Sequence, residues 1–305
     1  MYAAPPDIAT SVFTRLPDMY RDPDRHSAWT LARGLGPMHS FLEGPAFDRA
    51  GNLYVVDLAH GRIFRISPSG AWTLFADYDG QPNGLKIHRD GRIFVADVIH
   101  GILCFDPESG ARQSVLATYE GMPLAGPNDL VFADNGDLYF TDPGHSGQHS
   151  SDGRVFRIRT DGGVDLVMRD LPYPNGLVLT PQQDALLVAL SGSLQVARLM
   201  LTTQRGGVFP WRTFIQLSGG LAGPDGMAVD ERGNVAVVHA GFGTVWQFSA
   251  LGEPLARIRS CAGIRTTNVA YGGADRRTLY ITECEHGVIL VAHTETPGRP
   301  MFSHS

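Results

Sequence analysis

The chain has 305 residues, of which 43% are hydrophobic and 18% charged, and its formal net charge at pH 7 is −6. This composition is typical of a folded protein with a large core, and no apolar stretch is long enough to span a membrane. The acidic surplus contains no block of basic residues, so we expect neither a nucleic-acid nor a membrane partner. The N-terminus lacks a basic stretch followed by an apolar one, which predicts a cytoplasmic protein.

Residues 1–40 form a leader rich in proline and charge, and two stretches in it, 11–16 and 28–32, are predicted to be short strands. A regular order begins at Glu43. Four strands joined by turns are predicted there, over residues 44–47, 53–57, 62–66 and 71–75. The same order returns from Pro82, and its turns contain the Asp-Gly and Asn-Gly pairs typical of β-hairpins.

A short polar motif precedes the first strand of every repeat. The six residues that mark it are Glu43, Asn83, Asn128, Asn175, Asp225 and Asn268, at spacings of 40, 45, 47, 50 and 43. Four strands per repeat at such a period predict an all-β fold, a six-bladed β-propeller with four-stranded blades around a central channel. We expect one domain over residues 1–305. The sixth repeat is short of strands, so one of the two leader strands is expected to complete it and close the ring.

In a propeller the first strand of each blade lines the channel, so the six motif residues should converge at one mouth. The second strands end at the same face, with Asp57, Asp97, Asp142, His239 and Glu283. A single Asn or Asp beside Pro or Gly is usually a turn former. Its repetition before every first strand favours a binding site. Carboxylate and amide oxygens without Cys or His are typical of a hard cation, Ca²⁺ rather than Zn²⁺.

The loop after Asp142 is long for a hairpin, and its His145 is predicted to reach the same mouth and contact a substrate. Three classes of enzyme site have no matching motif in the sequence. A strand–turn–helix G-x-S-x-G, a GxGxxG and a P-loop are all missing.

The ordered set of motifs resembles the gluconolactonase/regucalcin (senescence marker protein) family. The residues that carry the resemblance are Glu43-Gly44-Pro45, Pro127-Asn128-Asp129, Pro174-Asn175-Gly176-Leu177, Pro224-Asp225-Gly226-Met227 and Thr267-Asn268-Val269-Ala270. The resemblance implies a six-bladed propeller that holds one divalent cation, Ca²⁺ first, with Zn²⁺, Mn²⁺ or Mg²⁺ as alternatives. It implies Glu43, Asn128, Asn175 and Asp225 as metal ligands, Asp129 as an acid or base, and Asn83 and Asn268 as groups around the substrate.

The predicted activity is metal-dependent hydrolysis of a sugar-type lactone, with the cation polarising the carbonyl. Asp225 or Asp129 would take a proton from water, and direct attack by Asp225 is an open variant. Two alternatives stand beside it: a hydrolase of organophosphates or fluorophosphates on the same metal site, and a calcium-binding propeller without catalysis. The predicted partner is a small lactone, and the sequence leaves the oligomeric state open.

Overall fold

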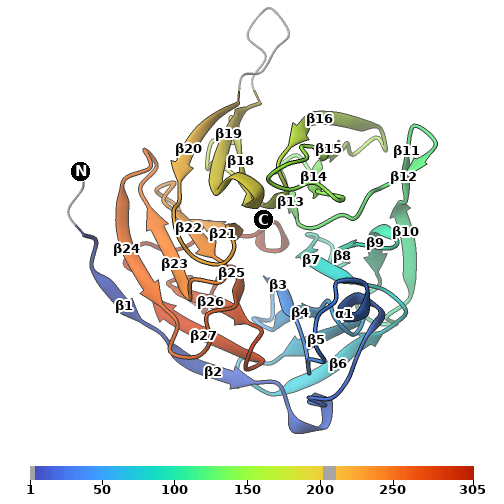
Figure 1. Cartoon of the computed structure of the whole chain (residues 1–305), viewed down its shortest axis with the longest axis horizontal. Coiled ribbons are helices and arrows are strands. Elements are labelled where there is room, and N and C mark those ends of the chain that lie inside the picture. Colours follow the sequence, from blue (N-terminus) through green and yellow to red (C-terminus); the bar gives the residue numbers. More distant parts are fainter. Residues whose placement is uncertain (1–3, 202–210) are drawn as a thin grey trace, which may run out of the picture.

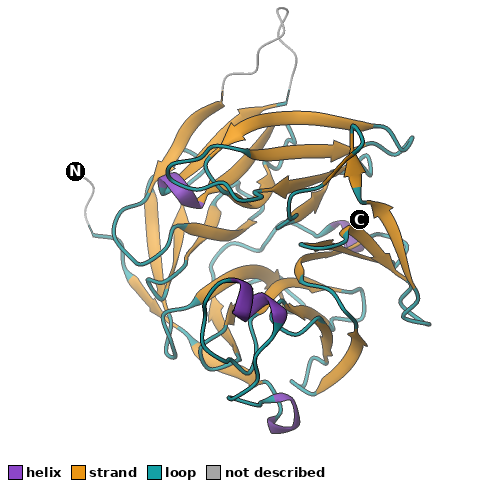
Figure 2. Ribbon diagram, turned by 45° about the vertical axis from the view of Figure 1, so that its right-hand side comes forward, coloured by secondary structure: helices purple, strands orange, loops and turns teal. Residues whose placement is uncertain are grey.

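The computed structural model describes residues 4–201 and 211–305. Six sheets, each built on an antiparallel four-stranded blade, stand around a central channel (Figure 1), which confirms the predicted six-bladed β-propeller with four-stranded blades. Figure 2 shows that helices are only short pieces outside the sheets. No helix in the described residues is long and apolar enough to cross a membrane.

Each blade is a meander whose first strand lies at the channel and whose fourth lies at the rim. The first three blades are β3 (Leu42–Phe47), β4 (Leu53–Asp57), β5 (Arg62–Ile66), β6 (Trp72–Asp77); β7 (Pro82–Ile87), β8 (Ile93–Asp97), β9 (Gly101–Phe105), β10 (Arg112–Leu116); and β13 (Leu130–Phe132), β14 (Leu138–Asp142), β15 (Gly153–Ile158), β16 (Val164–Leu171). The next two are β17 (Pro174–Leu179), β18 (Ala185–Leu190), β19 (Gln195–Met200), β20 (Trp211–Gln216); and β21 (Pro224–Val229), β22 (Val235–His239), β23 (Thr244–Phe248), β24 (Pro254–Arg259). The sixth contains β25 (Thr266–Gly272), β26 (Thr278–Glu283) and β27 (Val288–His293), and a two-stranded ribbon of β11 (Thr118–Tyr119) and β12 (Met122–Pro123) lies outside the blades.

The leader completes the sixth blade, as expected. Strand β2 (Ser11–Arg15) pairs antiparallel with β27, so residues from the two ends of the chain share one sheet. Strand β1 (Asp7–Ala9) adds a fifth strand to the previous blade and pairs parallel with β24, which the sequence did not predict. Asp7 also forms ion pairs with Arg257 and Arg259. The leader therefore holds the fifth and sixth blades together at the rim (Figure 1).

The second predicted leader strand, residues 28–32, is wrong: α1 (Ala28–Ala32) is a helix. Ser27 caps it, because its hydroxyl accepts from Thr30 N at 3.2 Å while Thr30 Oγ1 accepts from Ser27 N at 2.9 Å. This reciprocal pair is a capping box, which stabilises a helix start. Trp29 packs with Leu58, just after β4, so the helix lies on the mouth face of the first blade.

The core of the protein is divided among the blade–blade interfaces. One buried apolar cluster lies between each pair of neighbouring blades, including the pair that closes the ring. A single four-stranded sheet would leave both faces in water, so each blade depends on its two neighbours for burial. This requirement makes the ring close and fixes where every first strand points.

The C-terminal segment crosses the channel on the face away from α1. Arg299 bonds both carboxylate oxygens of Asp134 at 2.8 Å, and Arg276 donates to the Gly298 carbonyl at 2.8 Å. Phe302 stacks on Phe132 with ring centroids 4.8 Å apart. Residues 299–302 also line a cavity of about 100 Å³ in the channel, together with side chains from the inner strands. The segment therefore bounds the channel on that side, and it includes the short helix η3 (Phe302–His304).

Candidate active site

The predicted motif residues stand at one level of the channel. In four blades the residue before the motif residue pairs with the end of the second strand: Leu42 with Asp57, Pro82 with Asp97, Pro174 with Leu190 and Pro224 with His239. In the sixth blade Thr266, two residues before Asn268, pairs with Glu283. Glu43, Asn83, Asn175 and Asp225 follow directly in their own strands. Glu43, Asn83, Asn128 and Asn175 are buried, while Asp225 keeps partial exposure. The expected ring at one mouth is therefore present.

Asn268 has a different position in this ring from the one the spacing predicts. By strand register Thr267, not Asn268, is the counterpart of Asn83, and Asn268 matches the following glycine. Asp129 has the same local geometry as Asn268. The side-chain oxygen of each accepts from the next backbone N–H at 2.8 Å, and the N–H of each donates to a threonine hydroxyl on the second strand. Asp129 and Asn268 belong to the third and sixth blades, which face each other across a six-bladed ring.

The glycines of the motif make room for these side chains. A Cβ on Gly84 would lie 2.7 Å from Asp129 Oδ1, and one on Gly226 would lie 2.0 Å from Asn268 Oδ1. Real Cβ atoms do not come so close to another heavy atom, so glycine is required for neighbouring inner strands to touch. The glycine of Pro-Asn-Gly is thus a packing residue between blades as well as a turn former.

Three carboxylates gather at this ring. Burial raises the pKa of Glu43 to about 8, although hydrogen bonds from Gly44 N and the Asn268 amide oppose the shift, and the nearby charge of Asp129 adds to it. Burial also raises the pKa of Asp225 well above its usual range, and the charges of Glu43 and Asp129 add to that effect. Buried like charges disfavour ionisation unless something positive lies between them. A positive charge between these carboxylates would favour their ionised forms.

Uncharged oxygens complete the ring. Among the described residues, the side-chain oxygens of Asn83, Asn128 and Asn175 accept no hydrogen bond, although the amides are buried. Asn175 donates to Ser191 Oγ at 3.2 Å, which orients its amide. Carboxylates and free amide oxygens together are a donor set for a hard cation. The described part of the chain holds no cluster of three or more His, Cys, Asp or Glu spaced for a metal, and the set here has only two carboxylates among its four predicted ligands.

Lys86 is a site residue that the sequence reasoning missed. Its Nζ lies 3.7 Å from Asp129 Oδ1 and donates to the Leu85 carbonyl at 3.1 Å. The ammonium partly offsets the raised pKa of Glu43. The strand register shows why Lys86 stands out. Its counterparts in the other five blades are Ala46, Val131, Val178, Ala228 and Ala270, all apolar. A lone lysine at a position that is apolar in other repeats indicates a role in the channel.

The loop after Asp142 does not bring His145 into the carboxylate cluster. His145 is exposed and makes no hydrogen bond with the described residues. The neighbouring Ser146 is buried instead, and its Oγ accepts from Tyr173 N at 3.1 Å. Tyr173 has a φ of 56° immediately before the Pro174-Asn175 motif. Burial raises the pKa of the Tyr173 phenol, and the charge of Asp225 adds to the shift.

The acids at the second-strand ends lie on the predicted face but serve the fold. Asp57 accepts from Phe41 N at 2.8 Å and pairs with the buried Arg62. Asp97 accepts from the Tyr78 hydroxyl at 2.9 Å and from backbone N–H groups in the following turn. Such contacts satisfy buried backbone donors at the loops that enter and leave the inner strands.

Known proteins are similar to this chain over most of its length. A gluconolactonase from Zymomonas mobilis is 32% identical over 286 residues, which is 84% of this chain and 79% of that protein. The structure of a gluconolactonase from Xanthomonas campestris matches with a TM-score of 0.72 and 26% identity, over 85% of this chain and 86% of that one. A calcium-binding protein, regucalcin, from Agrobacterium tumefaciens has the same fold, with a TM-score of 0.78 at 19% identity over 99% and 100% of the two chains.

The match to a family covers the four-stranded meanders of the first five blades, the first two strands of the sixth and every motif residue of the ring. Residues 41–285 fit the family described as the SMP-30/Gluconolactonase/LRE-like region. This span includes the first strand of the first blade and the last motif, and it leaves out the leader, strand β27 and the C-terminal segment. Because the match covers most of the chain, this protein belongs to the SMP-30/Gluconolactonase/LRE-like family.

Proposed function

We propose that this protein hydrolyses a lactone, a cyclic ester, at the carboxylate ring of the mouth, with the help of one divalent cation. The observation that carries the proposal is the gathering of Glu43, Asp129 and Asp225 beside buried amide oxygens. The relatives named gluconolactonase support a lactone as the substrate class. The C-terminal segment bounds the channel on the other side, so substrate would enter from the mouth.

The cation would be held by Glu43, Asn128, Asn175 and Asp225. Their oxygens fit Ca²⁺ best, because neither Cys nor His is among them, and Zn²⁺, Mn²⁺ and Mg²⁺ remain alternatives. The raised pKa values of Glu43 and Asp225 support this assignment, since both groups lack a positive partner strong enough to keep them ionised. When bound, the cation would supply a Lewis acid for the carbonyl oxygen and for the negative charge that develops on it.

The proton chemistry would belong to the two aspartates. Asp129 lies next to the ligand Asn128 without being one of the four ligands, so it can accept the proton of an attacking water. Asp225 is the second candidate for this step. After ring opening, the protonated carboxyl group would return its proton to the leaving ring oxygen. In the variant in which the carboxylate of Asp225 attacks the carbonyl carbon directly, the ring oxygen would leave and take a proton, and water would then hydrolyse the resulting mixed anhydride to release the open-chain acid and restore Asp225.

The remaining residues would orient substrate and catalytic groups. Asn268 donates to Glu43 Oε2 at 3.0 Å and so directs the other oxygen, Oε1, toward the ring. Asn83 offers a buried amide to a substrate hydroxyl or carbonyl. The ammonium group of Lys86 would partly neutralise the carboxylate of Asp129 from the channel side. His145 remains a candidate for contact with parts of the substrate that extend beyond the mouth.

The test combines metal removal with a substrate panel. We expect the purified protein to open aldonolactones in a pH-indicator assay, to lose the activity after EDTA, and to regain it with CaCl₂. Asp225→Ala should abolish the activity, whereas Asp18→Asn, an exposed acid of the leader, should leave it unchanged. Lactonase activity that survives both EDTA and Asp225→Ala would overturn the proposal. Faster turnover of organophosphates, or no turnover at all with calcium bound, would favour one of the two alternatives.

A further inference from the structure

Lys86 is the only lysine of the chain, and every other residue in its total of 25 Lys and Arg is arginine. It lies near the end of β7 and lines the same channel cavity of about 100 Å³ as residues 299–302. Apart from Lys86, Asp134 and Arg299, the side chains that line this cavity are uncharged. A single ammonium group therefore stands in a largely apolar part of the channel.

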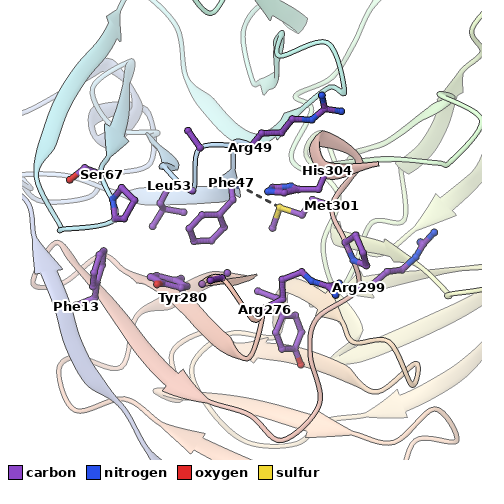
Figure 3. A pocket seen from close by; sticks show the side chains of 18 residues that line it. Phe13, Phe47, Arg49, Leu53, Ser67, Arg276, Tyr280, Arg299, Met301 and His304 are labelled. Carbon is purple, nitrogen blue, oxygen red and sulfur yellow. Dashed lines mark hydrogen bonds between the residues drawn. The ribbon is translucent and has the colours of Figure 1, made fainter.

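The other cation of the channel cavity, Arg299, is already neutralised. It belongs to the C-terminal segment, which also bounds a cavity of about 560 Å³ between the first and sixth blades (Figure 3). Both carboxylate oxygens of Asp134 accept from Arg299 at 2.8 Å. Of the two cations in the described wall of the channel cavity, Lys86 is therefore the one whose charge acts on the carboxylate ring.

Asp129 is the carboxylate that faces this ammonium. Lys86 Nζ lies 3.7 Å from Asp129 Oδ1, which is a charge–charge distance rather than a hydrogen bond, and it donates to the Leu85 carbonyl at 3.1 Å. No other carboxylate of the described residues lies within 4.0 Å of it. The Asp129 side chain is 3% exposed and that of Lys86 is 22% exposed, so solvent screens the pair only weakly.

The fifth and sixth blades provide an internal comparison without these charges. Asn268 has the local geometry of Asp129, with an amide in place of the carboxylate. By strand register the residue of the preceding blade that corresponds to Lys86 is Ala228. The backbone arrangement is the same at both places, so packing does not require a lysine at position 86. The lysine accompanies the carboxylate, and the alanine accompanies the amide.

The contacts of Asp129 hold one carboxylate oxygen and leave the other free. Oδ1 accepts from the following backbone N–H at 2.8 Å and faces Lys86, whereas Oδ2 accepts no hydrogen bond from the described residues. In the sixth blade the corresponding atom, Asn268 Nδ2, reaches the next blade and donates to Glu43 Oε2 at 3.0 Å. The same geometry directs Asp129 Oδ2 toward Asn175 of the fourth blade, which has the register of Glu43.

A count of charges shows what the lysine adds. Glu43, Asp129 and Asp225 carry three negative charges when ionised, and one divalent cation supplies two positive charges. The ammonium of Lys86 supplies the third. On the basis of the proposed function, we propose that Lys86 is a positioning residue for lactone hydrolysis. It balances Asp129 and so keeps this carboxylate out of the ligand set of the cation, with Oδ2 free for the attacking water.

A lysine suits this role better than an arginine. A guanidinium binds a carboxylate through two parallel hydrogen bonds, which would occupy both oxygens of Asp129. An ammonium is a compact point charge and can balance Asp129 through Oδ1 alone. This difference gives a physical reason for one lysine in a chain that otherwise uses arginine.

Lys86→Met tests the proposal, because it should change calcium affinity and turnover in opposite directions. Calorimetry should show calcium binding about three- to tenfold tighter, since a like charge is removed from beside the cation and Asp129 can join its ligands. The kcat on an aldonolactone should fall by about tenfold or more, because a carboxylate bound to the cation is a poorer base. A variant that only disturbed the fold would weaken both.

Two variants control for the change of charge. Lys86→Arg keeps the charge and should bind calcium within about twofold of the unmodified protein, although its kcat should fall because the guanidinium occupies both oxygens of Asp129. Arg299→Met removes a charge from the wall of the same cavity. It should also leave the calcium affinity within about twofold, because Asp134 already neutralises that charge.

A mutant cycle measured by urea unfolding in EDTA tests the pair without cation or turnover. Lys86→Met should lower the urea midpoint of the unmodified protein, because it leaves the buried Asp129 without its partner, and should not lower that of Asp129→Asn. The proposal is overturned if Lys86→Met binds calcium no more tightly than the unmodified protein does, or if it shifts the midpoint equally in both backgrounds. Failure of the unmodified protein to open any lactone would contradict the proposed function instead, because the calcium affinities and the cycle still report on Lys86.

Discussion

Asn268 Nδ2 donates to Glu43 Oε2 at 3.0 Å, which joins the sixth blade to the first across 225 residues of sequence. The same Oε2 also accepts from Gly44 N at 2.9 Å, so the Glu43 carboxyl group is held from two sides. Oε1 accepts no hydrogen bond from the described residues and stays available to a cation. The first and sixth parts of the propeller are thus joined at two places, at the rim by strand β2 and at the channel by the Asn268–Glu43 hydrogen bond.

We expect Asn268→Ala to weaken calcium binding and to destabilise the fold by about 1.5–3 kcal/mol, because a hydrogen bond to a buried carboxyl group is lost. Calcium titration and urea unfolding measure the two effects. Asn234→Ala is the matched control, because Asn234 donates to Asp230 Oδ2 at 2.7 Å in a hairpin on the other face. It should lose stability and keep the calcium affinity. Equal calcium affinities for Asn268→Ala and the unmodified protein would contradict this role.

Gly226→Ala should disturb the same pair from the neighbouring blade. The new Cβ would lie 2.0 Å from Asn268 Oδ1, so either the amide or the inner strand must move. We expect a loss of about 1–3 kcal/mol in the free energy of unfolding, the usual cost of overpacking, and weaker calcium binding. Gly36→Ala is the control, since nothing lies within 4 Å of its Cβ position. If both variants unfold at the same urea concentration, the close approach of Gly226 to Asn268 does not contribute to the stability of the protein.

The stability of the metal-free protein should fall as the pH rises from about 4.5 to about 8. Burial raises the pKa of Glu43 from 4.5 to about 8, so in this window the folded state keeps a proton that the unfolded state has lost. The stabilisation from Glu43 is complete below the lower value and is lost as the pH reaches the upper one, with a slope of up to about 1.4 kcal/mol per pH unit. Asp225, whose pKa is also raised, adds a slope of the same sign. Urea unfolding in EDTA at several pH values gives the slope, and Glu43→Gln should reduce it. An identical slope in Glu43→Gln would show that another group is responsible.

Asp129→Asn separates catalysis from metal binding. The amide keeps the contact with Leu130 N at 2.8 Å but accepts a proton poorly. We expect kcat on a lactone to fall by about 10²–10⁴, the usual contribution of a general base, with a much smaller change in calcium affinity. Asp170→Asn, an exposed acid of the same blade, should leave both quantities unchanged. An unchanged kcat in Asp129→Asn would leave Asp225 as the proton acceptor.

Phe302→Ala should destabilise the protein without changing its chemistry. Phe302 is buried against Phe132, and the Arg89 guanidinium lies 4.2 Å from its ring centroid. Removing a buried phenylalanine costs about 3–5 kcal/mol. The unfolding midpoint in urea should fall, while kcat well below the transition stays within twofold, because the contact is on the face away from the carboxylates. Met19→Ala, at an 80% exposed position, is the control. A large change in kcat would instead connect the C-terminal segment to the site.

The sequence by itself determined the number of blades, the strand order within each blade and five of the six residues at the level of the inner ring, Asn268 being the exception. These features depend on short-range patterns, apolar strands bounded by Asp-Gly turns and repeated at a nearly constant period, which are local properties of the chain. The motif at Pro127-Asn128-Asp129 and its copies in the other repeats also predicted that polar side chains converge at one mouth of the channel, because the first strand of every propeller blade lines the axis.

Only the tertiary structure decided how the repeats fit together. Whether 11–15 or 28–32 completes the sixth blade depends on which segment has a free strand edge to pair with, and the capping box at Ser27 made the second one a helix. Asn268 takes the register of Asp129 because strand pairing, not spacing, sets that position. Lys86 gains its role from Asp129, a group that is distant in the chain. Close packing between blades fixes these relationships, and a local pattern does not show which side chains of neighbouring blades will meet.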